Sequence, residues 1–148
     1  MPKINLFLDS SALISGIISA DGAARVLLLL AGTGHLELTI SEQVVAETER
    51  IIARKAPRAV NDYRRAIRES KVRVLRDPEA EDVRNNLHLI AHAPDVPILL
   101  AAMRAHVDML VTLNRKHFID DPQVAIKTGL RIGTPGDALG WVRSRLGE

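Results

Sequence analysis

Short apolar runs of strand length alternate with helix-like segments along this chain, and the alternation strongly constrains its fold. The runs lie at residues 4–8, 36–40, 72–75, 109–112 and 130–132. Helix start signals and helical spacing predict helices at about 9–16, 22–31, 41–54, 58–70, 78–93 and 97–106, and from Pro135 onward. Strands that alternate with helices favour right-handed crossovers. We therefore predict an α/β fold, a three-layer α/β/α sandwich around a mostly parallel sheet of four to five strands.

Length and composition limit the class of protein. The chain has 148 residues, of which 47% are hydrophobic, and this is enough for one core. We expect a single domain, residues 1–148, because no repeat or linker divides the chain. No apolar run approaches the roughly 20 residues of a membrane span, and the first residues lack a signal-peptide pattern, so a cytoplasmic protein without a membrane partner is expected. Because cysteine is absent, any metal ion must be bound by oxygen or imidazole.

Positive charge is concentrated between residues 50 and 76. This segment contains ten Lys or Arg residues against two acids, a balance of +8, although the whole chain carries only +2. A polyanion such as RNA would suit it, because neutralised phosphates release counterions. Arg64, Arg65 and Arg68 are the predicted substrate contacts. A solvated helix face explains the pattern equally well, and the sequence leaves both interpretations open.

Asp9 and Asp95 occupy positions where a ligand site is expected. Asp9 ends the first apolar run, and ligands of open parallel sheets bind beyond the carboxyl ends of the strands. Asp95 lies just before the helix expected from Pro97, where it would face the same crevice. Each residue also suits a turn or a helix N-cap, so neither is diagnostic alone.

Glu47 is more informative, because it lies on the apolar stripe of its helix. It shares that stripe with Val44, Thr48 and Ile51 by three- and four-residue spacing. A buried, unpaired carboxylate is unfavourable, so Glu47 needs a cation, a proton or a crevice nearby. Arg50 or Arg54 could supply the cation. Together with Asp9, the pattern favours a bound metal ion.

Four segments together resemble PIN domains, particularly bacterial members described as toxin components of toxin–antitoxin systems. They are LDSSALISG (8–16), LTISEQVVAETERII (38–52), DVPILLAAM (95–103) and DMLVTLNRKHF (108–118), and the resemblance covers nearly the whole chain. It implies a metal-dependent ribonuclease in which Asp9, Glu47 and Asp95 bind Mg²⁺ or Mn²⁺. It also implies an antitoxin partner that masks the acidic crevice, and a homodimer, for which the run VLLLLA (26–31) offers a surface.

The fourth segment departs from that family. Many PIN domains have another Asp two residues after the threonine, whereas Thr112 is followed here by Leu113 and Asn114. The amide oxygen of Asn114 can still bind a hard cation or orient its water, but the site loses one negative charge. We count Asn114 with the catalytic residues and expect weaker metal binding or only one well-held ion. By the same resemblance, Ser10 and Thr112 would bond the carboxylates or the scissile phosphate.

Three more polar groups have weaker support. Asp120 or Asp121 could replace the missing charge, although an Asp pair before Pro122 is good turn chemistry. His117 could contact a phosphate, although a histidine beside an aromatic residue is usually structural. His88 and His92 have helical ligand spacing, but HLIAH lacks the Glu of a zinc-protease motif, so both are interpreted as structural.

Other functions fit the sequence less well. A haloacid-dehalogenase-type phosphatase needs a second Asp two positions after the first, where this chain has Ser11. A response-regulator receiver needs a phospho-acceptor Asp and a switch lysine that are not found. The serious alternative is a PIN-fold module with weak or no catalysis that binds RNA or protein, with Asn114 marking the lost activity.

Overall fold

The structure is a computed structural model that describes residues 3–19 and 21–147. Five strands form one sheet in the order β3-β2-β1-β4-β5, and every neighbouring pair is parallel. The strands are β1 (Asn5–Leu8), β2 (Glu37–Ser41), β3 (Arg73–Leu75), β4 (Met109–Val111) and β5 (Ile132–Gly133). The prediction of an α/β sandwich with four to five mostly parallel strands is confirmed.

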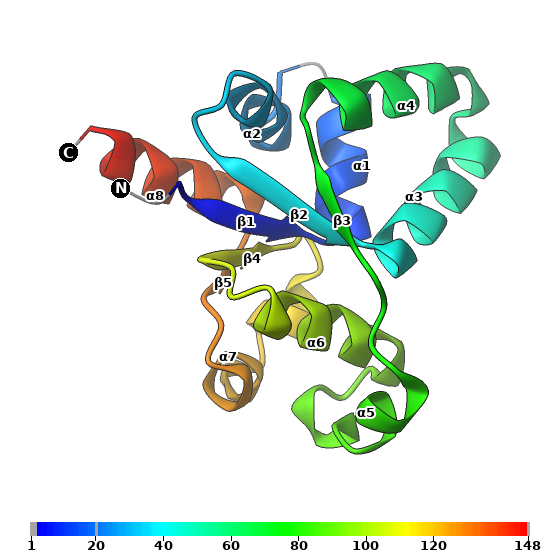
Figure 1. Cartoon of the computed structure of the whole chain (residues 1–148), viewed down its shortest axis with the longest axis vertical. Coiled ribbons are helices and arrows are strands. Elements are labelled where there is room, and N and C mark those ends of the chain that lie inside the picture. The colour runs from blue at the N-terminus through cyan, green and yellow to red at the C-terminus, as the bar shows by residue number, and fades with distance from the viewer. Residues whose placement is uncertain (1–2, 20, 148) are drawn as a thin grey trace.

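Helices cover both faces of this sheet (Figure 1). The helices are α1 (Ser10–Ile18), α2 (Ala23–Gly32), α3 (Glu42–Lys55), α4 (Val60–Glu69), α5 (Ala80–Arg84), α6 (Val96–Arg104), α7 (Pro122–Thr128) and α8 (Pro135–Leu146). Figure 1 shows α1 to α4 on one side of the sheet and α5 to α7 on the other, and α8 packs against α2. The chain therefore crosses to the opposite face between β3 and β4.

The core explains why the positions of the strands could be predicted from the sequence. The central strands β1 and β4 are buried on both faces, so Leu6, Phe7, Leu8, Leu110 and Val111 are all fully enclosed. Parallel strands of this kind read as continuous apolar runs instead of alternating ones. The buried apolar residues form one connected cluster that includes the inner faces of the helices. Burial of both sheet faces therefore stabilises the fold and leaves only the ends of the strands open to ligands.

The segment before α6 differs from the prediction of one helix over residues 78–93. Helix α5 ends at Arg84, and two short 3-10 turns follow, Leu87–Leu89 and Ala93–Asp95. The side-chain amide of Asn86 donates to the Asp82 carbonyl at 2.7 Å, a local bond that competes with helix continuation. This irregular segment brings His92 and Asp95 to the carboxyl edge of the sheet.

The segment after β4 also contains structure that the sequence did not predict. A π-helical turn (Arg115–Ile119) and helix α7 lie where only loop was expected, and β5 begins at Ile132 instead of Leu130. Asp121 caps α7 by accepting from the Gln123 amide at 3.0 Å, and Gly129 ends that helix with a φ of 71°. The Asp pair before Pro122 predicts a turn, whereas the structure has a helix N-cap at Asp121.

None of the described helices is by itself long and apolar enough to cross a membrane. Helices α1 and α2 reach that length and composition only when they are taken together as a bent pair.

Candidate metal centre

The fold places Asp9 and Thr112 side by side. Asp9 directly follows β1, Thr112 directly follows β4, and the two strands are neighbours. The Asp9 backbone N–H donates to the Val111 carbonyl at 3.2 Å, so the pairing continues to the site. The chain leaves β1 toward one face of the sheet and leaves β4 toward the other (Figure 1), so the strand order reverses between these two strands. Open parallel sheets bind their ligands in a crevice at the carboxyl ends of the strands at such a switch point.

Asp9 is buried, with 4% of its surface exposed, yet its carboxylate is fully hydrogen-bonded. Its Oδ2 accepts from Thr112 Oγ1 at 2.5 Å, and its Oδ1 accepts from Ser11 Oγ at 2.7 Å and from the Ala12 N–H at 3.0 Å. The last of these bonds caps α1, so the interpretation of Asp9 as an N-cap is correct. It does not account for the bonds from Thr112 and Ser11. Burial raises the pKa of Asp9 despite these donors, and the nearby Asp95 carboxylate raises it further. A bound cation would stabilise the charged form.

Glu47 reaches the same crevice from the first half of α3. Its carboxylate accepts from Ser10 Oγ and from Gln43 Nε2, each at 2.9 Å, and Gln43 Nε2 also donates to the Pro94 carbonyl at 2.9 Å. These bonds hold α1, α3 and the turn before α6 together around the carboxylate. Among the residues that the structure describes, neither Arg50 nor Arg54 makes an ion pair with Glu47, so the suggested structural partner is not found.

Asp95 occupies the N-cap position of α6, but its side chain makes no capping hydrogen bond. Helix capping therefore does not explain why an Asp stands at this position. Its Oδ2 instead faces His92 Nδ1 at 2.9 Å and His117 Nδ1 at 3.7 Å. Burial raises the pKa of Asp95, the histidines lower it, and the charge of Glu47 raises it again. Hydrogen bonds bring the three carboxylates to one end of the sheet. Ser10 donates to Glu47 and its neighbour Ser11 donates to Asp9, while Gln43 links Glu47 to Pro94, the residue before Asp95.

This set of residues fits a divalent cation. In the described part of the chain, no Lys or Arg pairs with Asp9, Glu47 or Asp95. The only ion-pair partners of these carboxylates there are the two histidines beside Asp95, so the repulsion between the carboxylates is not relieved by a Lys or Arg. Oxygen ligands of this kind suit Mg²⁺ or Mn²⁺, which commonly keep several waters and bind directly to only one or two carboxylates. The crevice is therefore chemically suited to a divalent metal ion.

Asn114 lies in the crevice but its amide is already engaged. Its Oδ1 accepts from the His117 backbone N–H at 3.2 Å and caps the π-helical turn, while its Nδ2 lies 3.1 Å from His117 Nδ1. The Asn114 N–H donates to Thr112 Oγ1 at 2.9 Å, the same hydroxyl that donates to Asp9. Asn114 thus positions Thr112 and His117. The other candidate, Asp120, is exposed.

Sequence reasoning missed Ser11 and Gln43, gave His117 only weak support and interpreted His92 as structural. Ser11 donates to Asp9 and accepts from the Leu113 N–H at 2.9 Å, so it links the two strand ends. His92 and His117 stack with ring centroids 4.5 Å apart and 9° between their planes. Only the spacing His92-x-x-Asp95 signalled this contact, and the pairing of His92 with His88 obscured it.

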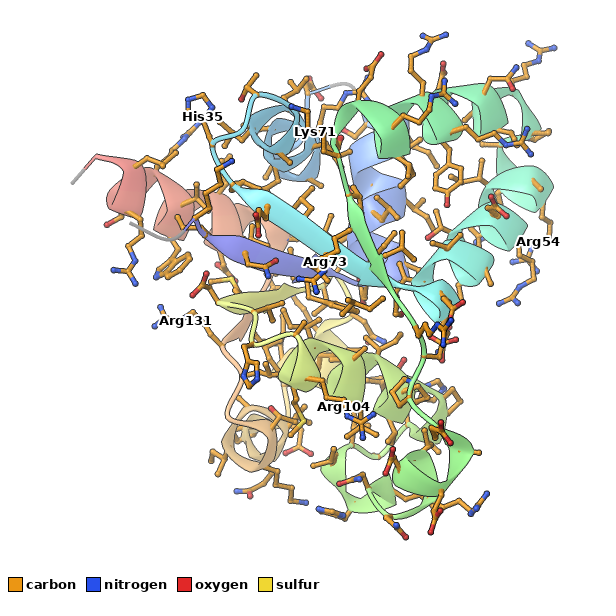
Figure 2. The ribbon with its side chains drawn as sticks, viewed as in Figure 1. His35, Arg54, Lys71, Arg73, Arg104 and Arg131 are labelled. Atoms are coloured by element: carbon orange, nitrogen blue, oxygen red, sulfur yellow. The ribbon has the colours of Figure 1, made fainter. Side chains whose placement is uncertain are left out.

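The basic residues of α4, in the middle of the segment 50–76, lie away from this crevice. In Figure 1, α3 leads from the carboxyl end of β2 outward to α4, which carries Arg64, Arg65 and Arg68, all of them exposed. Figure 2 shows Arg54 extending outward from α3 and Lys71 where α4 leads into β3. The positive segment therefore forms an outer band, and α3 connects it to the carboxylates.

The fold and the crevice together define a class: parallel α/β proteins with a carboxylate-rich site at the switch in strand order, suited to a divalent cation. Within this class, the family model of the PIN domain matches residues 5–116. The chain therefore belongs to the PIN domain family, as its four sequence segments predicted.

Solved structures agree on the fold. PAE2754 from Pyrobaculum aerophilum is 20% identical, with a TM-score of 0.59 over 95% of this chain and 90% of that one. VapBC2 from Rickettsia felis, bound to a DNA fragment from its promoter, is 18% identical, with a TM-score of 0.62 over 88% and 98%. VapC20 from Mycobacterium tuberculosis, a sarcin–ricin loop cleaving toxin, is 15% identical, with a TM-score of 0.54 over 75% and 91%. A comparison with curated proteins finds no match.

Proposed function

We propose that this protein is a divalent-metal-dependent endoribonuclease. The observation that carries the proposal is the hydrogen-bonded placement of Asp9, Glu47 and Asp95 at one end of the sheet, where among the described residues no Lys or Arg pairs with them. Such a site gains stability from a bound cation and loses it when the cation is removed. Membership of the PIN domain family supports the same chemistry.

The residues of the crevice have distinct roles in this proposal. Asp9 is the central ligand, and Glu47 and Asp95 bind the Mg²⁺ or Mn²⁺ ion directly or through water. The bound ion would activate a water and stabilise the charge that develops on the phosphate. Thr112 and Ser11 orient the Asp9 carboxylate, and Ser10 orients Glu47. Asn114 supports the site by holding Thr112.

RNA would reach the crevice along the basic band of residues 50–76. Arg64, Arg65 and Arg68 are exposed and would contact phosphates, which provides affinity but little sequence selectivity. The sarcin–ricin loop cleaving toxin VapC20 and the VapBC2 complex share the fold and support a toxin role with an antitoxin partner, which would insert a basic side chain among the carboxylates. We further propose a single cytoplasmic domain that forms a homodimer, with Leu29 of α2, which is 61% exposed, as one contact.

The test is cleavage of end-labelled single-stranded and hairpin RNA with Mg²⁺, with Mn²⁺ or with chelator. Cleavage is expected only with metal, and Asp9→Asn is expected to abolish it, because the neutral side chain keeps the cap of α1 but removes the central charge. The unfolding midpoint of the variant serves as the control for the fold. Full activity of a folded Asp9→Asn protein would reject the proposal.

A second function is favoured by the engagement of Asn114 with His117. Because Asn114 replaces an acid and its oxygen caps the π-helical turn, the chain would in this case bind RNA or a protein partner through the PIN fold without cleaving. Metal-independent RNA binding without cleavage under every metal condition would select this function.

A further inference from the structure

Two histidines and one carboxylate meet at the edge of the crevice. They come from two separate segments: His92 and Asp95 flank one 3-10 turn, and His117 lies in the π-helical turn after β4. One potential ligand atom of each residue lies within 4.8 Å of the other two. Among the described residues, no other group of three His, Asp or Glu side chains reaches this spacing. The group of Asp9, Glu47 and Asp95 does not reach it either.

We infer that His92, Asp95 and His117 form a binding site for a divalent transition-metal ion that accepts imidazole nitrogen. The site shares Asp95 with the proposed nuclease centre. Its part in RNA cleavage rests on that proposed function, but its ability to bind metal does not.

The distances between these side chains are compatible with ligands of one ion, which would replace the hydrogen bond between His92 and Asp95. His92 Nδ1 lies at hydrogen-bond distance from Asp95 Oδ2, 2.9 Å, but His117 Nδ1 lies 3.7 Å from the same oxygen, which is too far for a hydrogen bond. Ligands about 2.1 Å from a common ion lie roughly 3 to 4 Å from one another. Both separations are therefore compatible with a shared ion after a small movement of the rings.

Asn114 keeps His117 in the form that binds metal. Its Oδ1 accepts from the His117 backbone N–H, so its NH₂ group faces His117 Nδ1 at 3.1 Å and requires an unprotonated nitrogen there. The same nitrogen lies 3.7 Å from Asp95 Oδ2, and two acceptors this close to one another favour a cation between them. An incoming ion would replace the amide contact.

The site is accessible and has room to adjust. The side chains of His92, His117 and Asp95 are 46%, 29% and 14% exposed. The stacked rings are nearly parallel, so at least one must turn before both lone pairs point at a single ion. His92 can do so because about half of its side chain faces solvent.

The ligand set also predicts which metal binds. Two imidazoles and one carboxylate, with the remaining positions open to water, suit Zn²⁺, Fe²⁺, Co²⁺ or Ni²⁺, whereas Mg²⁺ prefers oxygen ligands throughout. His117 lies three residues after the position where this chain lacks an acid. At this edge of the crevice imidazole nitrogen takes the place of a missing carboxylate oxygen, so the site of His92, Asp95 and His117 prefers transition metals to Mg²⁺.

The test is a titration of the untagged, chelator-treated chain with Co²⁺, followed by the visible absorption of the bound ion. We expect one Co²⁺ per chain, displaced by Zn²⁺ but not by a large excess of Mg²⁺. His92→Ala and His117→Ala should each weaken Co²⁺ binding by at least about tenfold, since even outer-shell changes often have that effect. His88→Ala is the matched control and should bind as the parent chain does, because His88 lies outside the group.

Equal Co²⁺ affinity in the parent chain and in His92→Ala would overturn the inference, as would ready displacement by Mg²⁺. His92→Ala decides the question alone if His117→Ala does not fold, because His92 is half exposed and contributes little packing. Asp9→Asn separates this site from the proposed nuclease: it should keep the Co²⁺ spectrum while losing RNA cleavage. An inactive chain that still binds Co²⁺ through the histidines would reject only the nuclease proposal.

Discussion

At the scale of single residues, the crevice is held together by hydroxyl groups that each bridge two segments. Thr112 Oγ1 donates to Asp9 and accepts from the Asn114 N–H, and Ser11 Oγ donates to Asp9 and accepts from the Leu113 N–H. Each hydroxyl donates its hydrogen to the Asp9 carboxylate, so the orientation of the hydroxyl is fixed. These bonds keep a buried carboxylate in place, but they do not remove the cost of its charge, because burial still raises its pKa.

The raised pKa of Asp9 predicts how stability depends on pH in the absence of metal. A carboxyl whose pKa is higher in the folded chain than the ordinary 3.8 binds its proton more tightly when folded. Its contribution to stability is therefore greatest at low pH, falls as pH rises from about 3.8 through the raised value, and is constant above that. Urea unfolding in chelator should show a smaller loss of stability over this range for Asp9→Asn than for the parent chain. Identical pH profiles would mean that Asp9 is not destabilised by burial.

At the scale of elements, the sequence predicted strands better than the irregular segments. Each strand begins and ends within about two residues of its apolar run, because burial on both faces requires apolar residues throughout. The acids at the strand ends follow from the same order of elements. The meeting of His92 with His117 does not, because it depends on a 3-10 turn and a π-helical turn whose conformations are set by local side-chain bonds and tertiary packing.

Close packing of α2 against α4 predicts a contrast between two glycines. A Cβ at Gly32 would lie 2.8 Å from the Glu69 carbonyl oxygen, a backbone atom that cannot easily move, whereas a Cβ at Gly140 in α8 would meet nothing within 4 Å. Gly32→Ala should therefore lower the free energy of unfolding by about 1–3 kcal/mol through overpacking. Gly140→Ala should raise it by about 0.5–1 kcal/mol, since Ala is the better helix former. Urea unfolding measures both, and stabilisation by Gly32→Ala would show that the two helices do not approach so closely.

At the scale of the whole molecule, negative and positive charge are separated. The carboxylates lie at the carboxyl edge of the sheet, and the basic residues of segment 50–76 follow the outer band from α3 through α4 to β3 (Figures 1 and 2). Bound RNA would contact this band while one phosphate lies in the crevice. The same separation would let a partner block the crevice without covering α4.

Charge reversal on α4 tests whether this band binds RNA. Replacing Arg64, Arg65 and Arg68 by Glu should weaken RNA binding and flatten the slope of log affinity against log salt concentration by about two, the loss expected for three phosphate contacts on a single strand. The matched control replaces Arg131, Arg143 and Arg145 by Glu. These three are exposed, change the net charge equally, and belong to the segment before β5 and to the last turns of α8.

The comparison between the two triple variants decides the question. If only the α4 variant loses affinity and salt dependence, the band is an RNA-binding surface, because a general change in net charge would affect both variants. An equal loss in both would show that RNA responds only to the total charge of the protein. The basic segment would then be a solvated helix face, and any RNA selectivity would have to come from the crevice itself.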